Sequence, residues 1–456
     1  MVKHISRKPT DIFGWLLVSK LFKHPPTRRT VRLLVGALFV SALYFGFTYP
    51  HKASNPYTTA IFWSLFWPFF MIVSLVVAGP AFCGICPHGV IGRWMAKHGN
   101  KKPMPTILRH KGIGITILLI AYWLPLYLFP GLLETPWVAS LLFLVLTLAA
   151  LFFFWRYDGM AYCSYICPIG AVTKAYGKTG MVRLHTYQDA CGACKSFACA
   201  KACDSRLQPF LFDKKNSMRE CTLCMDCADA CEAVAFSIVP PGKGLLGTIK
   251  DKDNMHTWVY IILLTVITMT MRLHHGLGHS PIKTQLPWYR LGHATEALLP
   301  IGMDWVGFYA LLTSLAIVAV SVFGGFLIAA SILKVPFKNF LHDHSYALAP
   351  VMLIGSLSHV GSFFFLHYSS TLSNAFYWLI GSSERIAPLA TMHDGWVHLF
   401  SLFGYLGAFW SLWILYKRMQ RIPASLGKRV GAWIVASSVI WIYLGLLVLQ
   451  MRVMHH

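Results

Sequence analysis

The chain has 456 residues, of which 56% are hydrophobic and only 12% are charged, and its mean hydropathy is +0.55. A soluble globular protein carries about 25% charged residues, so this composition excludes an ordinary soluble enzyme. The formal net charge is +23. In so apolar a chain, this excess of Lys and Arg is explained by the basic cytoplasmic loops of a membrane protein rather than by nucleic-acid binding. We therefore expect no nucleic-acid partner. All 12 cysteines lie between Cys83 and Cys231 in short clusters, which favours metal binding over a disulfide framework.

A basic N-terminal segment, residues 1–30, precedes the first apolar stretch. There Ile12, Phe13, Trp15, Leu16 and Leu17 lie among Lys and Arg residues and predict an amphipathic surface helix. After it, apolar stretches of about 20 residues, the length that crosses a bilayer, predict nine membrane helices. They cover approximately residues 31–50, 58–79, 112–130, 137–155, 256–272, 305–333, 346–367, 394–416 and 431–451.

The distribution of Lys and Arg predicts the orientation of these helices. Residues 1–32 carry eight such side chains, the next loop, 50–57, carries one, and the loop 417–430 carries five. Cytoplasmic loops are the ones enriched in Lys and Arg. We therefore expect a multi-pass protein of the bacterial cytoplasmic (inner) membrane, with its N-terminus in the cytoplasm and its C-terminus in the periplasm.

One hydrophilic region, 180–252, interrupts the apolar pattern and holds eight of the 12 cysteines. The predicted fold is a polytopic all-α membrane protein with an inserted two-cluster ferredoxin-like α+β module. A four-helix membrane block, 31–179, precedes this module, and a five-helix block, 253–456, follows it. The charge count places the module in the cytoplasm.

Two cysteine runs in this region have the spacing of iron–sulfur ligands: Cys221-x2-Cys224-x2-Cys227-x3-Cys231 and Cys191-x2-Cys194-x4-Cys199-x3-Cys203. In two-cluster bacterial ferredoxins the fourth cysteine of a run ligates the other cluster. We therefore predict one [4Fe–4S] cluster on Cys191, Cys194, Cys199 and Cys231, and a second on Cys203, Cys221, Cys224 and Cys227. Zinc is the alternative, but its paired CxxC motifs are separated by a wider gap.

The remaining four cysteines form two similar motifs after the second and fourth predicted crossings. They read Cys83-Gly-Ile-Cys86-Pro87-His88-Gly89 and Cys163-Ser-Tyr-Ile-Cys167-Pro168-Ile169-Gly170. The repetition predicts two related helical hairpins. Three interpretations stay open here: a third iron–sulfur centre shared by the hairpins, a redox-active thiol site, or four buried and inert cysteines.

With these motifs ahead of a two-cluster module, residues 30–252 resemble the NapH/NosR-type membrane iron–sulfur proteins. Their pattern has three residues between the paired cysteines, as between Cys163 and Cys167, whereas the first pair has two. The chain has no N-terminal flavin-binding domain of the NosR type, so it is more similar to NapH. The resemblance implies electron transfer between the quinone/quinol pool and a redox partner, such as a reductase or a cytochrome c type protein.

The second membrane block contains histidines that suit redox chemistry. His359 and His398 lie at similar depth on neighbouring predicted crossings, and one histidine from each of two facing helices can ligate haem b. Hydrogen-bonded packing is the alternative. The outer loop carries His274, His275, His293 and Glu296, which predict a quinol or metal site, since quinol oxidation needs a base; a solvated loop is the alternative.

Three functions are consistent with these features. The first is a respiratory electron-transfer protein, or quinol dehydrogenase subunit, that uses two [4Fe–4S] clusters and quinone, while a third iron–sulfur centre and haem b stay open. The second is an assembly or maturation factor that supplies electrons to a metalloenzyme. The third is a transporter with a regulatory cluster module, although no inverted repeat with broken helices is visible. The ligand pattern favours the first.

Overall fold

The computed structural model describes residues 7–192, 194–215, 217–249 and 254–454. The expected boundary between the module and the second membrane block, at residues 252–253, lies outside the described residues. The chain forms two compact units. The first comprises Met1–Leu118, Glu134–Gly244 and Thr371–Arg385, and the second comprises Leu119–Leu133, Leu245–Ser370 and Ile386–His456.

In the described part of the chain, seven helices are long and apolar enough to cross a membrane. They are Pro25–Thr48, Pro56–Ala78, Pro136–Arg156, Asn254–His279, Trp305–Leu333, Phe337–Leu379 and Gly395–Met419. An eighth crossing is formed if the pair Leu426–Ala436 and Ser438–Val453, bent by 49°, is one span. The predicted crossing at 112–130 is the shorter apolar helix Gly112–Leu128, so seven or eight spans replace the nine expected. The chain is a polytopic helical protein, as predicted.

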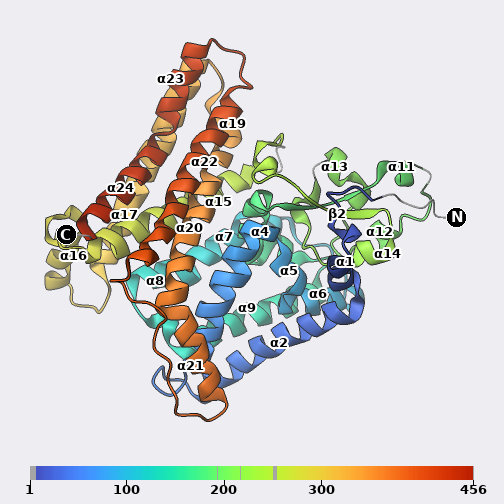
Figure 1. Cartoon of the computed structure of the whole chain (residues 1–456), viewed down its shortest axis with the longest axis horizontal. Coiled ribbons are helices and arrows are strands. Elements are labelled where there is room, and N and C mark those ends of the chain that lie inside the picture. Colours follow the sequence, from blue (N-terminus) through green and yellow to red (C-terminus); the bar gives the residue numbers. More distant parts are fainter. Residues whose placement is uncertain (1–6, 193, 216, 250–253, 455–456) are drawn as a thin grey trace. The chain divides into compact units, whose positions relative to one another are not determined.

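The helices of the first unit form the two predicted hairpins. Their bounds are α2 (Pro25–Thr48), α3 (Pro56–Thr59), α4 (Ser74–Ala78), α5 (Ala81–Ile85), α6 (Pro87–His98), α7 (Gly112–Leu118), α9 (Pro136–Arg156) and α10 (Pro168–Tyr176). Between α3 and α4 the second crossing is π-helical over Ala60–Val73, where Pro68 lacks the N–H that a regular helix needs. Helices α2 and α9 lie side by side (Figure 1). Gly46 allows this approach, because a Cβ there would overlap the Ser140 side chain.

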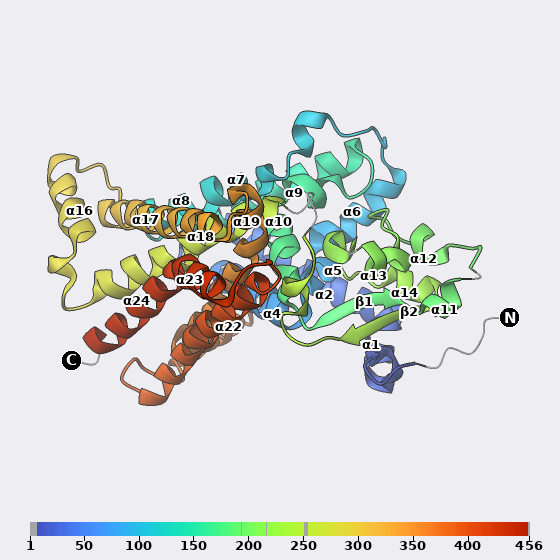
Figure 2. The same cartoon turned by 90° about the horizontal axis from the view of Figure 1, so that it is seen from above.

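The hydrophilic module of the first unit is built on one two-stranded antiparallel sheet. Its elements are β1 (Val182–Thr186), α11 (Gln188–Cys191), α12 (Ala198–Lys201), α13 (Phe212–Lys215), α14 (Asp226–Ala230) and β2 (Val234–Ile238). The register pairs Val182 with Ile238 and Thr186 with Val234. Figure 2 shows this sheet beside α14. The first cysteine run follows β1 and the second precedes β2, so the sheet holds both runs together.

The N-terminal segment packs on this module. Ile12 and Phe13 are buried, and the Phe13 ring lies 5.6 Å from the ring of Phe236 on β2. The buried Asp11 carboxylate accepts hydrogen bonds from the backbone N–H groups of Phe13 and Phe236, at 3.1 Å each. An amphipathic helix does follow, α1 (Leu16–Lys23), on which Leu17 is exposed. The apolar residues of this segment thus serve partly as core of the module.

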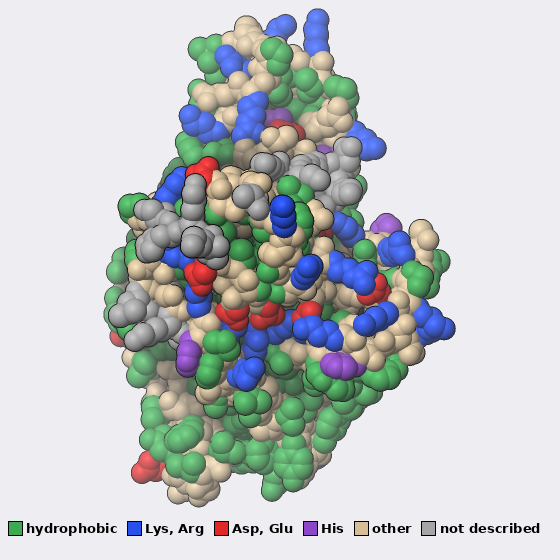
Figure 3. Space-filling model, turned by 90° about the vertical axis from the view of Figure 1, so that its right-hand side faces the viewer, with side chains coloured by type: hydrophobic (Ala, Val, Ile, Leu, Met, Phe, Trp, Pro, Cys, Tyr) green, Lys and Arg blue, Asp and Glu red, His purple; other side chains and the backbone are tan. Residues whose placement is uncertain are grey.

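Ion pairs join the basic N-terminal segment to acidic side chains at the end of the second cysteine run and directly after it. Arg7 and Lys23 contact Glu232 at 3.1 and 3.2 Å, and Arg28 pairs with Asp229. Figure 3 shows Lys and Arg side chains gathered around a short row of acidic ones on the face that this view presents. Some of the Lys and Arg residues that were counted to predict the cytoplasmic side therefore also form ion pairs within the first unit.

The second unit is almost entirely helical. Its helices are α8 (Leu124–Leu128), α15 (Asn254–Leu263), α16 (Pro287–Leu298), α17 (Trp305–Val318), α18 (Gly325–Leu333), α19 (Phe337–His344), α20 (Ala349–Phe363), α22 (Leu402–Met419), α23 (Leu426–Ala436) and α24 (Ser438–Met454), and α21 (Ser369–Leu379) continues from it into the first unit. Small residues allow close helix packing. A Cβ on Gly407 of α22 would lie 2.7 Å from the Pro350 carbonyl oxygen of α20, and one on Gly325 of α18 would lie 2.7 Å from that of Val435 of α23.

Candidate metal centres

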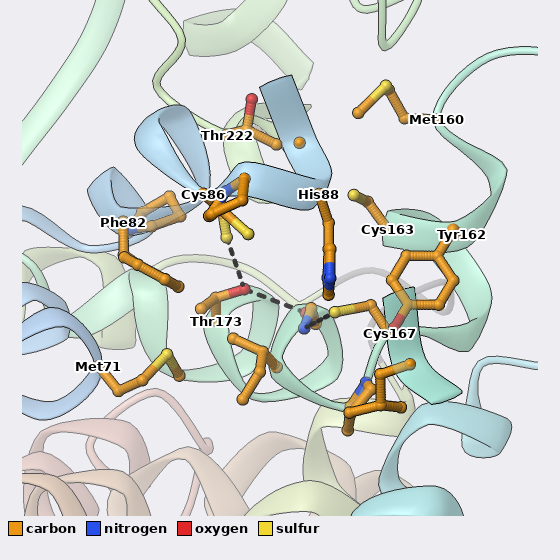
Figure 4. Close-up of a pocket in the computed structure, with 18 of the residues that line it drawn as sticks. Met71, Phe82, Cys86, His88, Met160, Tyr162, Cys163, Cys167, Thr173 and Thr222 are labelled. Atoms are coloured by element: carbon orange, nitrogen blue, oxygen red, sulfur yellow. Dashed lines mark hydrogen bonds between the residues drawn. The ribbon is translucent and has the colours of Figure 1, made fainter. Parts of the chain in front are cut away.

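The four cysteines of the two hairpins surround one cavity of the first unit. The cavity has a volume of about 120 Å³ and is lined by aromatic and other apolar side chains together with Cys83, Cys86, Cys163 and Cys167. Figure 4 shows Cys86, Cys163 and Cys167 around this space, with His88 and Tyr162 beside them. The structure therefore brings together side chains that are separated by about 80 residues of sequence, one pair from each hairpin.

The second cysteine of each pair lies at the N-terminus of a helix. Cys86 precedes Pro87, which begins α6, and Cys167 precedes Pro168, which begins α10. The N–H group of Gly170 donates to the Cys167 sulfur, with 3.3 Å between N and Sγ. Backbone N–H groups also donate to the Cys86 sulfur. Because a helix N-terminus favours negative charge, both hairpins direct N–H groups and helix dipoles toward a thiolate.

The glycine three residues after each of these cysteines is required by close packing. A Cβ on Gly89 would lie 2.9 Å from the Cys83 carbonyl oxygen, and one on Gly170 would lie 2.5 Å from the Cys163 carbonyl oxygen. Real Cβ atoms do not approach backbone oxygen so closely. The repeated Cys-Pro-x-Gly motif therefore builds the same turn twice.

Burial governs the acidity of the hairpin thiols. Burial, with the neighbouring Cys86 as the next cause, raises the pKa of Cys83 to about 11. Burial and then the charge of Cys86 raise the pKa of Cys167 to about 12. Reactive redox thiols instead have a lowered pKa. These sulfurs would become thiolates when a positively charged metal group lies among them, which is the chemistry of a metal-ligand set.

The eight cysteines of the module fall into two neighbour sets. Burial raises the pKa of Cys199 to about 11, and the next causes are the nearby thiols of Cys231 and Cys191. Burial also raises the pKa of Cys227, followed by the effects of the nearby Cys221, Cys224 and Cys203 and, last, of Cys199 from the other set. The first set is completed by Cys194, which also acts on Cys199. These neighbours coincide with the crossed sets that the spacing predicts, and cluster ligation itself stays a prediction.

Each candidate set consists of four cysteine thiols, which are the donors that iron–sulfur clusters take. In the part of the chain that the structure describes, no three His, Cys, Asp or Glu side chains are arranged to hold one metal ion. Structural zinc draws four ligands to about 2.3 Å from a single ion, whereas an iron–sulfur cluster is larger and separates its thiolates. The cysteine sets fit such clusters by the number and type of their donors.

The hairpin cavity adjoins the second cysteine run of the module. Glu220, Cys221 and Thr222 line the same cavity as the hairpin cysteines. The backbones also touch, because a Cβ on Gly84 would lie 2.7 Å from the carbonyl oxygen of Leu223. The predicted third centre and the predicted cluster on Cys203, Cys221, Cys224 and Cys227 are thus direct neighbours.

The predicted haem ligands lie on different elements of the second unit. His359 is on α20, where its ring lies 3.9 Å from the ring of Phe363 and its Nε2 atom lies 3.3 Å from the Tyr368 hydroxyl. His398 lies half-buried in the 3₁₀ segment Gly395–Ser401. The closest described contacts of His359 thus come from its own helix and the turn after it, and haem ligation by this pair stays a prediction.

The predicted quinol residues fall into two groups. His274 Nε2 lies 2.9 Å from Asp304 Oδ2, and the ring of His275 lies 4.6 Å from that of His274. His293 and Glu296 form a separate exposed pair on α16, with 3.7 Å between N and O. The site residue that we did not predict is Asp304. Asp304 is the N-cap of α17, a position that Asp commonly takes, so no sequence signal distinguished it.

Comparison with known proteins connects the hairpins to iron–sulfur binding. Residues 59–105 and 137–184, which contain the four hairpin cysteines, match a family described as a 4Fe–4S binding domain. The chain is 28% identical over 185 residues to the uncharacterised protein MJ0750 of Methanocaldococcus jannaschii, covering 37% of this chain and 75% of that protein. It is 25% identical over 250 residues to the proposed electron transport protein YccM of Escherichia coli, covering 48% of this chain and 67% of YccM. No solved structure matches the chain significantly.

Proposed function

We propose that this chain is an iron–sulfur protein that transfers electrons between the quinone pool of the inner membrane and a redox partner protein. The observation that carries the proposal is the convergence of four partly buried thiols, from two hairpins that match a 4Fe–4S binding domain, on one cavity. We assign a third [4Fe–4S] cluster to Cys83, Cys86, Cys163 and Cys167. When bound, such clusters supply one-electron transfer at potentials set by nearby charge, hydrogen bonds and exposure.

Differences in burial suggest the order of the three centres. The hairpin thiols line a largely apolar cavity, and Cys221 lines it too. By contrast, Cys194 lies among exposed residues such as Gly192 and Lys195, and backbone N–H donation from Phe197 lowers its pKa. We therefore place the set containing Cys194 at the end where a partner docks. The neighbouring Lys195 and Lys201 are exposed and favour a partner with an acidic surface. The Lys and Arg distribution supports a cytoplasmic position for this end.

The second unit offers a candidate base for quinol oxidation. Hydroquinone loses protons as it loses electrons, so its site needs a proton acceptor. His274 is buried, its Nε2 atom is held by Asp304, and its Nδ1 atom has no hydrogen-bond partner among the described residues. This is the arrangement of a histidine oriented by a carboxylate. We propose that His274 Nδ1 accepts a proton from the quinol hydroxyl.

Metal analysis of the purified full-length protein tests the cluster assignment. We expect about twelve iron and twelve sulfide per chain, since each [4Fe–4S] cluster contributes four of each, with matching optical and EPR signals. A content near eight of each would contradict the third cluster. A content near four, or stoichiometric zinc, would contradict the ferredoxin-like assignment as well.

A reduction assay tests the quinol site. A reduced water-soluble quinol analogue added to the oxidised protein should bleach the cluster absorbance. His274→Ala should slow this bleaching about 100-fold, the usual contribution of a general base, while cluster content is unchanged. The control is His393→Ala, which removes an exposed histidine of the same unit. Equal rates in the wild type and His274→Ala would exclude His274 as the base.

A further inference from the structure

Two arginines from different helices meet at the loop between Cys83 and Cys86. Arg32 of α2 and Arg93 of α6 both donate to the carbonyl oxygen of Gly84, with N–O distances of 3.1 and 3.4 Å. The side chain of Arg93 is only 9% exposed. Buried charges are screened little by salt or water, so these guanidinium groups act strongly on their surroundings.

The same arginines also face the second cysteine run of the module. Arg32 donates to the carbonyl oxygen of Cys224 at 2.9 Å. The two carboxylate oxygens of Asp226 each lie 3.9 Å from one guanidinium group, Oδ1 from Arg32 and Oδ2 from Arg93. Two positive charges and one negative charge therefore leave a net positive charge between the two sets of cysteines.

Arg93 acts on both sets at once. Its Nη2 atom donates to Gly84, between Cys83 and Cys86, and its Nε atom lies 3.9 Å from Asp226, two residues after Cys224. In addition, Arg93 Nη1 is buried without a hydrogen-bond partner in the described part of the chain. The guanidinium charge is therefore only partly compensated by its direct contacts, and its field extends to the sulfurs on either side.

We propose that Arg93, supported by Arg32 and opposed by Asp226, is a positioning residue that sets the reduction potentials of two adjacent centres together. The proposal rests on the proposed function, since it needs clusters on both cysteine sets. Reduction adds one negative charge to a centre. A nearby buried positive charge favours that state and raises the potential, and a carboxylate lowers it. Because one guanidinium group lies near both centres, their potentials shift in the same direction. The difference between the two potentials, which sets the free energy of electron exchange between the centres, therefore changes little.

The test is an EPR-monitored redox titration of the full-length protein. Arg93→Gln, which keeps an N–H donor for Gly84 but removes the charge, should move two midpoint potentials to more negative values. We expect at least a tenfold change in each one-electron equilibrium, which corresponds to about 59 mV. The third potential, assigned to the set containing Cys194, should not move. Arg93→Lys keeps the charge and should shift the two potentials less.

A second variant and a control complete the design. Asp226→Asn should shift the same two potentials in the opposite, positive direction, and it changes shape so little that folding should be preserved. Arg29→Gln removes an equal charge from an exposed position on α2 and should leave all three potentials unchanged. Unshifted potentials in both Arg93→Gln and Asp226→Asn, or an equal shift in Arg29→Gln, would overturn the proposal.

Cluster content separates this inference from the function on which it rests. Iron and sulfide are measured on each sample before titration. If the wild type lacks the hairpin cluster, the proposed function fails. If all clusters are present and the potentials do not respond to the charge changes, the proposed function stands and the role of Arg93 fails. A loss of clusters in Arg93→Gln alone leaves Asp226→Asn to decide the question.

Discussion

Cys167→Ser is expected to remove the hairpin centre while leaving the ferredoxin-like module intact. Cys167 caps α10 and lines one cavity with the other three hairpin cysteines, so one missing thiolate leaves an incomplete ligand set in an apolar site. Serine is a poor substitute because its hydroxyl does not ionise at neutral pH and oxygen is a harder ligand than thiolate. Iron should fall from about twelve to about eight per chain.

Electron delivery should fall with the cluster. Reduction of the remaining module by the quinol analogue should be at least tenfold slower in Cys167→Ser, because the cavity of the hairpins adjoins Cys221 and the variant removes the centre next to it. Cys194→Ser is the contrasting control: it should lose the exposed centre and keep the hairpin one. Unchanged iron content and an unchanged reduction rate in Cys167→Ser would show that the hairpin thiols carry no redox centre.

The largest expected effect on stability comes from a buried arginine in the second unit. Arg418 of α22 is fully buried, and it donates to Asp343 Oδ1 at 2.8 Å and to the carbonyl oxygen of Gly247 at 3.2 Å. It also donates to the carbonyl oxygen of Leu245. Arg418→Ala leaves these acceptors without their donor in a largely buried site. We expect the free energy of unfolding to fall by about 3 kcal/mol, the low end for a broken buried pair, since Asp343 is partly exposed.

Denaturant or thermal unfolding in detergent measures this loss of stability. The next helix, α23, offers a suitable control position. Lys428 is exposed on α23, so Lys428→Ala should change the free energy of unfolding by less than about 0.5 kcal/mol. A similarly small change in Arg418→Ala would mean that water or a neighbouring side chain satisfies the acceptors once the guanidinium is gone.

Features that depend on short stretches of chain could be predicted from the sequence. Membrane helices follow from local hydropathy, and most of the expected crossings are present as long apolar helices. The third expected crossing ended early, as Gly112–Leu128, because hydropathy locates an apolar run better than it locates the ends of a helix. The similarity of the Cys83 and Cys163 motifs also predicted related hairpins, since the same Cys-Pro-x-Gly turn needs the same residues in both.

The residues that the sequence left in separate motifs were assembled by the tertiary structure. Arg32 and Arg93 are ordinary basic residues in a count of loop charges, and Asp304 is a lone acidic residue before a helix. Only long-range packing brings the arginines to Asp226 and Asp304 to His274. Such contacts depend on which helices pack together, which no local pattern encodes.

The N-terminal segment shows the same division most clearly. Its amphipathic character is a property of residues 12–17 alone, and the sequence by itself determined that an apolar side would be buried and that a short helix would form. Whether that side met lipid or protein was decided by the tertiary structure, in which Phe13 packs on Phe236 and Asp11 bonds to the backbone of β2. Local chemistry specifies that apolar surface must leave water, and only the assembled fold supplies the surface that covers it.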